Sequence, residues 1–496
     1  MLENEFHKLE EKQEIRSTLS QIRSEIREPE KKEAFARLLA GKESMLIAFL
    51  ADEDAKTRKN AALLIGDLQV EQAKDALLTA YQKETTLFVR SSYLAALGKL
   101  DVREDLEFFK ARLEELKNQQ MSVEEQKHQG EEIRELSQII LKTEGVRKHP
   151  FTGFQMPHEM LLFTNREQRE VTLSEVKEIG ASVQRRAELH PLGVQVFSKE
   201  VIPFTKLRTY RELLFPIHTS EKIPMKAQAA AELLWSSDLY AFLTECHKGE
   251  APFYFRLEVK GKEPQTEFVK KLGMALEKIS EWKLMNSTTD YEIEIRLIEA
   301  KDGSFVPFLK LYSMKMKRFA YRKNAIAMSI HPATAAMLMY LAKPYLKENA
   351  QILDPCCGVG TMLIERDILV PAREKYGIDI YGDAIEMARE NAALAGEKIN
   401  FIHRDYFDFK HDYKFDEIIT NMPVKGKKSK EDMDAFYARF FEKSKSLLAE
   451  DGIIIMYSNE VGFVKKQLRL QPCYRLLQEY TIRKKDSYCL FIIGIK

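Results

Sequence analysis

The hydrophobic pattern divides the chain into three regions. Before about residue 145, apolar residues recur every three or four positions, as at Leu106, Phe109 and Leu113, and this spacing predicts helices only. From about Lys148, apolar runs such as FYFRLEVKG alternate with helical segments such as EFVKKLGMALEKI, which is typical of an α+β module. From about Ser329, strands and helices alternate regularly, which predicts a doubly wound α/β sheet with a largely parallel core.

Two segments of the helical region resemble each other. LADEDAKTRKNAALLIGDL and QKETTLFVRSSYLAALGKL align Arg58 with Arg90 and Gly66 with Gly98, at an offset of 32 residues. A period near this length is typical of stacked helical hairpins, and the pattern resembles HEAT-type repeats. A plain helical bundle with a chance similarity is the alternative. We expect an all-helical region over 1–147, which could bind a protein partner.

Composition narrows the class of protein. The 496 residues are 45% hydrophobic and 31% charged, as in a globular protein of two to four domains. The net charge is +1, so any basic surface must be local. The five cysteines lack the CxxC spacing of a zinc site, and they are too few for a disulfide framework. With a polar N-terminus and no apolar run that spans a bilayer, we expect a cytoplasmic protein without a metal.

A basic segment closes the second region. Lys315, Lys317, Arg318 and Arg322 lie in MKMKRFAYRKN, interleaved with aromatic residues. Cations and rings together suit a surface that contacts phosphates and stacked bases. Equally, the lysines could keep a solvated strand edge from pairing with another strand. The residues alone favour neither interpretation.

The strand ends of the third region carry candidate ligand-binding residues. The first strand ends in DPCCGVGT, where Gly358 and Gly360 permit a tight turn close to a ligand. The second strand ends at Asp379, whose carboxylate suits two ribose hydroxyls, and the third at Asp405, which suits the exocyclic amine of an adenine. The loop is neither GxGxxG nor a Walker-type loop. The pattern therefore favours a nucleoside without a pyrophosphate.

The charge of these strand ends favours one nucleoside. A carboxylate at Asp354 would stabilise the positive sulfonium of S-adenosylmethionine. Each acid taken alone has a structural explanation, Asp354 as a turn former and Asp379 or Asp405 as a helix cap. Three acidic strand ends around one glycine loop together favour a methyl-donor site.

Residues 321–496 resemble class I S-adenosylmethionine-dependent methyltransferases, and most closely the RNA methylase branch whose catalytic domain follows a THUMP domain. The motifs that carry the resemblance are Tyr321-Arg322, HPATAAML, LDPCCGVGTMLIE, GIDI and ITNMPVKG; the last stands where the branch has Asn/Asp-Pro-Pro-Tyr/Phe. Region 148–320 is similar, in its size and in its alternation of strands and helices, to the ferredoxin-like plus THUMP module of such enzymes. The resemblance implies an RNA-binding module over 148–320 and a Rossmann-like, seven-stranded domain over 321–496.

The candidate cofactor site combines the strand-end residues with further residues of these motifs. It comprises Pro332, Asp354, Cys356, Gly358, Gly360, Thr361, Asp379, Asp405, Tyr406 and Asn421. The branch implies methyl transfer to an exocyclic amine of a base, most closely guanosine N2 in tRNA. The oxygen of Asn421 and a following carbonyl can accept the amine hydrogens and aim the nitrogen lone pair at the methyl group. The candidate catalytic residues are Asn421, Met422, Pro423 and Val424.

The catalytic motif departs from the branch at two positions. Met422 replaces the first proline but keeps the carbonyl, while Pro423 still stiffens the loop. Val424 replaces an aromatic ring that would stack on the base, an interaction worth roughly 1–3 kcal/mol. The rings that could compensate are Phe407, Tyr437 and Tyr457, and the sequence does not rank them.

Lys425, Lys427 and Lys428 follow the motif and could bind RNA phosphates or form a solvated face. The candidate RNA-binding residues are Lys315, Lys317, Arg318, Arg322, Lys425, Lys427 and Lys428.

Two other functions fit the same motif: methylation of adenine N6 in DNA or RNA, and methylation of a protein glutamine amide. The THUMP-like module favours RNA over protein. A non-catalytic RNA-binding scaffold, with Asn421 merely capping its loop, is the alternative from another class.

Overall fold

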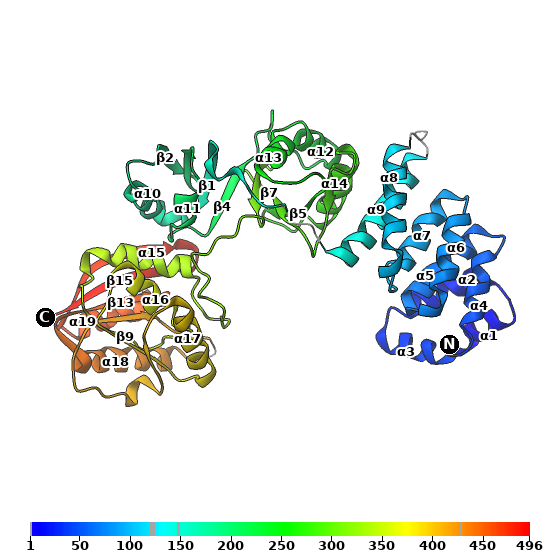
Figure 1. Ribbon diagram of the computed structural model, residues 1–496. Helices are drawn as coiled ribbons and strands as arrows, with labels where there is room; N and C mark the ends of the chain where they lie inside the picture. Colours follow the sequence, from blue (N-terminus) through cyan, green and yellow to red (C-terminus); the bar gives the residue numbers. More distant parts are fainter. Residues whose placement is uncertain (1, 120–124, 146–148, 427–428) are drawn as a thin grey trace. The chain divides into compact units, whose positions relative to one another are not determined.

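The computed structural model describes residues 2–119, 125–145, 149–426 and 429–496 (Figure 1). The chain forms two compact units, Met1–Lys148 and His149–Lys496. The predicted boundary at 147–148 falls on residues 146–148, outside the described residues. Among the residues that the structure describes, no helix is both long and apolar enough to span a bilayer.

The described residues of the first unit form helices and no strand, as the apolar spacing predicts. Glu84 binds both repeat arginines: its carboxylate accepts from Arg58 at 2.8 Å, and its carbonyl accepts from Arg90 at 2.8 Å. A Cβ on Gly66 would lie 2.6 Å from the Ala96 Cα, so glycine permits the close approach of two helices. The relation to HEAT repeats stays a prediction. The helices are α1 (Leu2–Glu10), α2 (Ile15–Glu25), α3 (Pro29–Leu39), α4 (Glu43–Ala48), α5 (Ala55–Leu68), α6 (Lys74–Lys83), α7 (Leu87–Leu97), α8 (Leu106–Asn118) and α9 (Gln126–Glu144).

The second unit begins with an eight-stranded mixed sheet in the order β2-β3-β1-β4-β8-β7-β5-β6. Its core of aliphatic and aromatic side chains includes residues of the helices α10 to α14, while a small cluster of Leu161, Leu214 and Phe308 forms a separate patch on the sheet. The strands are β1 (His158–Phe163), β2 (Arg185–His190), β3 (Gly193–Ser198), β4 (Glu212–Pro216), β5 (Phe253–Lys260), β6 (Leu284–Asn286), β7 (Ile293–Glu299) and β8 (Phe305–Leu311). The helices are α10 (Arg169–Glu178), α11 (Ile202–Thr205), α12 (Ala227–Trp235), α13 (Leu239–Cys246) and α14 (Thr266–Ile279).

A seven-stranded sheet follows, in the order β11-β10-β9-β12-β13-β15-β14. Its first five strands are parallel, and β15 and β14 form the antiparallel hairpin that the sequence predicts. The strands are β9 (Gln351–Asp354), β10 (Glu374–Asp379), β11 (Asn400–His403), β12 (Phe415–Asn421), β13 (Leu448–Ser458), β14 (Tyr474–Arg483) and β15 (Tyr488–Ile495). The chain order leaves β9 in both directions, so β9 and β12 flank the switch point where such sheets bind ligands.

Helices cover both faces of this sheet. One apolar core contains residues of α15 (Pro332–Ala342), α16 (Thr361–Leu369) and α17 (Gly382–Ala395). The other contains residues of α18 (Lys430–Leu447) and α19 (Val461–Leu470). The strand order and the two covered faces confirm the prediction of a doubly wound α/β domain.

Residues 312–331 connect the two sheets and contain neither helix nor strand. The interpretation of the basic segment as a solvated strand edge is therefore wrong, because no strand is present there. Arg318 donates to the carbonyls of Leu207 and Arg211 in the module formed by the eight-stranded sheet. The buried Tyr321 donates to Glu365 of α16 at 2.6 Å. Within four residues, the connection therefore forms hydrogen bonds first with the eight-stranded module and then with the seven-stranded domain.

Candidate active site

The glycine loop joins β9 to α16. Gly358 has φ of 51° and Gly360 has φ of 80°, a left-handed conformation that favours glycine. The Gly358 N–H donates to Asp379 Oδ2 at 2.8 Å, which ties the loop to the end of β10. A Cβ at Gly358 would meet no atom within 4 Å, whereas one at Gly360 would lie 2.9 Å from the Phe401 ring. Gly358 therefore borders open space and Gly360 packs against the domain.

The charges of the three acidic strand ends all act on the Cys356 thiol. Burial and the negative charges of Asp354, Asp379 and Asp405 all raise the pKa of Cys356. Burial also raises the pKa of Asp354 to about 8, against the N–H of Cys356 that it accepts at 3.0 Å. The nearby charge of Asp379 contributes to the same rise. A positive charge placed before Asp354 would favour its ionised form.

Each of the three acids also has a structural role, as the alternative explanation predicts. Their hydrogen-bond donors among the described residues are backbone N–H groups, from Cys356 to Asp354, from Gly358 and Tyr381 to Asp379, and from Phe407 to Asp405. In the described ranges none of the three forms an ion pair with a lysine, arginine or histidine. A carboxylate can accept several hydrogen bonds, so turn-forming and ligand binding are compatible here.

Other predicted cofactor residues lie around the same loop. The buried Thr361 hydroxyl has no hydrogen-bond partner among the described residues. Pro332 is the buried first residue of α15, which packs against α16. The Tyr406 hydroxyl bonds to Ser444 at 2.9 Å inside the core, so the ring of Tyr406 contributes to packing and only its main chain is left for a ligand.

Three residues beside the loop were not predicted from the sequence. Ile380 and Tyr381 follow Asp379 and are 56% and 66% exposed, so an apolar surface borders the acidic strand end. The signal was two large apolar residues placed directly after the strand. Asn391 donates to the carbonyls of Val359 and Asn324, both at 3.1 Å. This amide ties the glycine loop to the connection between the sheets.

The motif at the end of β12 lies on the neighbouring strand. Asn421 is half-buried, and its side chain forms no hydrogen bond with another described residue. The Met422 N–H donates to the Tyr457 carbonyl at 2.9 Å, and the Met422 side chain is buried in the core against α18. Pro423 and Val424 are half-buried. The chain is therefore fixed directly after Asn421, while the amide itself is left available.

The structure distinguishes the three rings that could replace an aromatic at Val424. Tyr437 is fully buried and bonds to Ser458. Tyr457 is buried and stacks on Tyr488 at 4.9 Å. Phe407 follows Asp405, is only half-buried, and lies 3.9 Å from the guanidinium of Arg439. Phe407 thus ranks first.

The candidate RNA-binding residues have different surroundings. Lys315, Lys317 and Lys425 are exposed, whereas Lys427 and Lys428 lie outside the described residues. The Arg318 guanidinium is committed to three main-chain carbonyls and stacks over Tyr210 at 3.7 Å. Arg318 therefore holds the connection in place.

Residues 320–483 match a family described as RMKL-like, methyltransferase domain. This region is a methyltransferase domain. Its cofactor is S-adenosylmethionine. The predicted cofactor and the predicted transferase activity are both confirmed. The matched region is the one that contains the glycine loop, the acidic strand ends and Asn421.

Several curated relatives align with part of the chain. tRNA (guanine(10)-N2)-dimethyltransferase of Methanothermobacter thermautotrophicus is 32% identical over 32% of this chain and 46% of its own length. Ribosomal protein L11 methyltransferase of Thermotoga petrophila is 26% identical over 37% of this chain and 64% of its own. U6 snRNA (guanine-N(2))-methyltransferase THUMPD2 of Bos taurus is 27% identical over 38% and 36%. Each alignment spans less than two thirds of the relative's length.

Solved structures share the fold of the second unit. TrmN from Thermus thermophilus superposes with a TM-score of 0.50 at 20% identity, over 68% of this chain and 99% of that one. SMU.472, complexed with SAH, gives 0.51 at 14% identity, over 68% and 98%. At these identities the likeness concerns the fold alone, and it confirms the Rossmann-like architecture.

The residues of the methyltransferase domain fit its cofactor. S-adenosylmethionine supplies a methyl group on a positively charged sulfur. The uncompensated carboxyl of Asp354 suits that charge, the open space at Gly358 admits a ligand close to the backbone, and Asp379 suits a pair of ribose hydroxyls. The orphan hydroxyl of Thr361 offers a further polar contact.

Asp379→Ala is expected to raise the dissociation constant for S-adenosylmethionine at least about tenfold, because a charged acceptor for hydroxyls is lost. Calorimetric titration measures it. Asp383→Ala, an exposed acid in the first turn of α17, is the matched control and should bind normally. An unchanged constant for Asp379→Ala would count against the ribose assignment.

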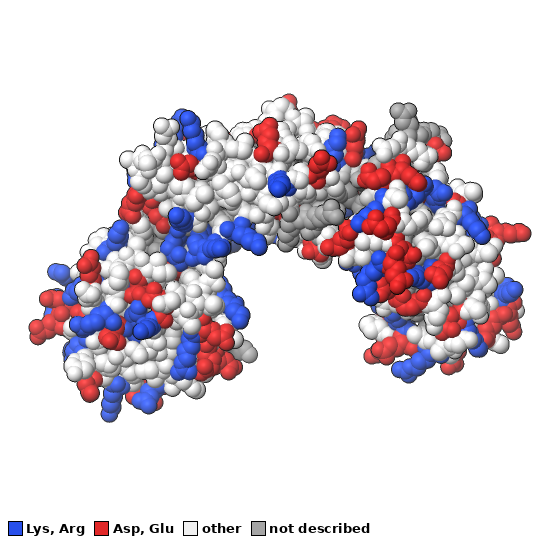
Figure 2. Space-filling model, in the orientation of Figure 1, with Lys and Arg blue, Asp and Glu red and all other residues white. Residues whose placement is uncertain are grey.

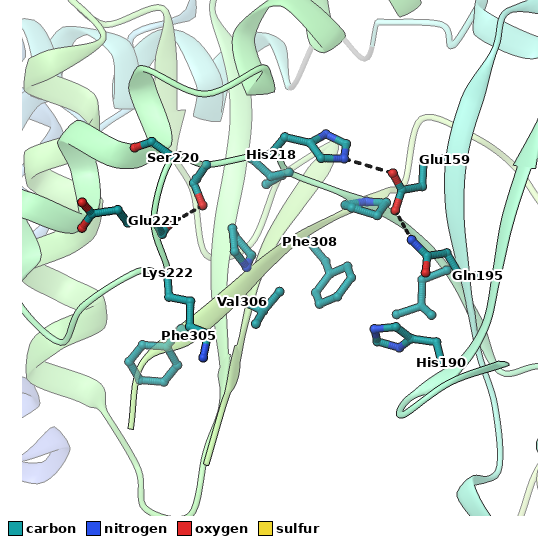
Figure 3. A pocket seen from close by; sticks show the side chains of 15 residues that line it. Glu159, His190, Gln195, His218, Ser220, Glu221, Lys222, Phe305, Val306 and Phe308 are labelled. Atoms are coloured by element: carbon teal, nitrogen blue, oxygen red, sulfur yellow. Dashed lines mark hydrogen bonds and ion pairs between the residues drawn. The ribbon is translucent and has the colours of Figure 1, made fainter. Parts of the chain in front are cut away.

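A separate cavity of about 430 Å³ lies on the eight-stranded sheet, lined by residues of β1, β4, β8 and the segment 216–222 (Figure 3). In it His218 points toward Glu159, at 3.0 Å, and also contacts Asp238. These carboxylates raise the pKa of His218. The lining contains no residue of the glycine loop or of the end of β12, so this cavity is distinct from the methyltransferase site.

Proposed function

We propose that this protein transfers a methyl group from S-adenosylmethionine to an exocyclic amine of an RNA base, with guanosine N2 in tRNA as the first candidate. One observation carries the proposal: the amide of Asn421, without a partner among the described residues, lies at the end of β12 beside the acidic glycine-loop site on β9 and β10. Two relatives named for guanine N2, one acting on tRNA and one on U6 snRNA, support this choice of base atom.

The chain orients a weak nucleophile. The amine lone pair of a base is delocalised into the ring, so it needs to be turned toward the methyl group. The Asn421 oxygen accepts one amine hydrogen and the Met422 carbonyl accepts the other, which draws the nitrogen toward a tetrahedral geometry. The bond from Met422 to Tyr457 and the ring of Pro423 hold these acceptors in place. Such orientation lowers the barrier without a strong base.

The electron balance of the transfer is simple. The nitrogen lone pair forms the new N–C bond while the S–C bond breaks and its electrons stay on sulfur, which becomes neutral. The nitrogen then carries one proton too many, and that proton leaves to solvent. The cationic nitrogen is far more acidic than the neutral amine, so no histidine or glutamate is needed in the motif.

A protein is the second candidate substrate, because a relative that aligns over 37% of this chain is named ribosomal protein L11 methyltransferase. Adenine N6 remains compatible with the same acceptor pair. The eight-stranded module over residues 149–311 favours RNA, through its resemblance to a THUMP-containing module. The helical unit of residues 2–145 is proposed to bind a protein partner, and a cytoplasmic location remains a prediction.

The function is tested by incubating the full chain with isotope-labelled S-adenosylmethionine and bulk tRNA from cells that lack the gene. Nucleoside mass spectrometry is expected to find the label in N2-methylguanosine. Label in N6-methyladenosine, or in protein when ribosomal proteins are supplied instead, would replace the proposed substrate. Tight cofactor binding with no transfer to any of these would favour the non-catalytic scaffold.

Phe407→Ala is expected to lower kcat/KM for tRNA about tenfold, because Phe407 is proposed to supply the stacking ring that Val424 lacks. Phe407→Tyr should keep most of the activity. Tyr413→Ala removes an exposed ring elsewhere in the same domain and serves as the control. Steady-state kinetics measure the three variants, and a normal kcat/KM for Phe407→Ala would reject this ring.

A further inference from the structure

Three arginines surround His331, the residue that caps α15. Arg322 donates to the carbonyl of Ile330 at 3.1 Å, and Arg211 donates to the Thr334 hydroxyl at 3.3 Å, so they bind directly before and shortly after His331. Arg318 holds the Arg211 carbonyl at 2.7 Å. Burial and, after it, the positive charges of the three arginines lower the pKa of His331 to about 4, while the negative charge of Glu212 acts in the opposite direction.

The cluster comes from separate parts of the chain. Arg211 directly precedes β4 of the eight-stranded sheet, Arg322 belongs to the connection, and His331 is the N-cap of α15. Figure 2 shows Lys and Arg side chains gathered on the visible face near the position that Figure 1 labels α15. The arginine cluster therefore forms only when the eight-stranded module and the methyltransferase domain are in contact.

The carboxylates nearest this cluster are bonded to other groups. Glu365 is bound to Arg208 and Tyr321, and Glu212 to Arg296 and Lys310. Among the described residues, no carboxylate forms an ion pair with Arg211, Arg318 or Arg322. The Arg322 Nε is buried and lacks a hydrogen-bond partner among those residues, and such a group costs free energy unless a ligand or water completes it.

The cluster and the methylation motif are linked through the core of the domain. Tyr457 belongs to the same apolar core as residues of α15, and α15 carries Thr334, whose hydroxyl accepts from Arg211. Tyr457 is paired with Asn421 in the sheet, and its carbonyl accepts from Met422. Strand β13 and helix α15 therefore connect the cluster with the acceptor pair through one core.

We infer that Arg211 and Arg322 bind a phosphodiester group of the RNA strand next to the nucleotide whose base enters the methylation site. This inference rests on the proposed function. Guanidinium groups form paired, charge-assisted hydrogen bonds to phosphate oxygens, and an anion here would neutralise the cluster. Arg318 is a positioning residue that fixes the main chain of Arg211. Because Arg211 belongs to the RNA-binding module, substrate docking on that module would place the target base at Asn421.

The test measures binding of bulk tRNA, prepared from cells that lack the gene, to the full chain over about 50 to 200 mM salt. Arg211→Ala is expected to weaken binding about tenfold and to reduce the slope of log K against log salt by about 1, and Arg211→Ala with Arg322→Ala by about 2. Arg211→Lys should keep the slope but not the full affinity. Arg469→Ala, an exposed arginine near the end of α19, is the matched control.

Two further readouts separate the possible failures. Thermal unfolding and S-adenosylmethionine binding should be unchanged in Arg211→Ala, because its side chain is exposed and its main-chain bonds remain. Equal salt slopes for the wild type and the double variant would overturn the phosphate site, whether or not tRNA is methylated. A wild type that binds tRNA with the expected loss of slope in the variants, yet transfers no methyl group, would remove the proposed function and support the phosphate site.

Discussion

Asn421→Ala is expected to lower the rate of methyl transfer by about 100- to 1000-fold, the usual loss when a group that orients or stabilises the reacting centre is removed. The reason is that one of the two acceptors for the amine hydrogens disappears, so the lone pair is no longer aimed. The cofactor should still bind, because the glycine loop and Asp379 are untouched. Single-turnover kinetics with tRNA, alongside calorimetry with S-adenosylmethionine, separate the two effects.

Matched variants make this result specific. Asn421→Asp keeps an acceptor oxygen and should retain more activity than the alanine variant. Asn400→Ala removes an exposed amide that contacts Glu374 at the start of β10 and should leave the rate unchanged. Near-normal turnover by Asn421→Ala would eliminate the alignment role and, with it, the proposed mechanism.

Glu417→Ala is expected to lower the free energy of unfolding of the methyltransferase domain by about 3–5 kcal/mol, because it leaves a buried arginine without its counter-charge. Glu417 lies in the middle of β12, and its two oxygens accept from Arg366 of α16, both at 2.7 Å. Neither side chain is exposed to solvent. Lys347 completes the group through its N–H and its carbonyl. Urea unfolding followed by circular dichroism measures the loss.

The pairing explanation has its own controls. Replacing both partners, as Arg366→Met with Glu417→Leu, should recover most of the stability, because no uncompensated charge remains. Glu374→Ala removes an exposed acid of β10 and should change the free energy of unfolding by less than about 0.5 kcal/mol. A loss below about 1 kcal/mol in Glu417→Ala would show that water or another anion replaces the partner.

Buried and exposed positions explain which elements could be predicted. Strands β9, β12 and β13 are apolar runs buried on both faces, so their composition identifies them without knowledge of neighbours. Strand β2, RRAELH, is largely solvated, and β4 is a short run of five residues. Neither shows the clear apolar pattern of an isolated strand, and both exist because they pair with β3, β1 and β8.

The departures at Met422 and Val424 were visible in the sequence, but their consequences were not. The structure buries the Met422 side chain in the core, so the substitution exchanges a stiff ring for packing. It also makes Phe407 the best of three candidate rings, because Tyr437 and Tyr457 are buried. Which ring is exposed depends on how α18 and β13 cover the sheet, and no local pattern contains that information.

The sequence by itself determined the order of strands and helices in the last third, the glycine loop and the acid at each strand end. These features depend on spacing along the chain, which sets backbone conformation and which side chains are buried. Only the tertiary structure decided that the charges of three carboxylates act on one thiol, that Arg318 binds main-chain carbonyls, and that Arg211 and Arg322 bind on either side of His331. Such meetings join residues that are distant in the chain, and they arise from packing between layers that no periodicity encodes.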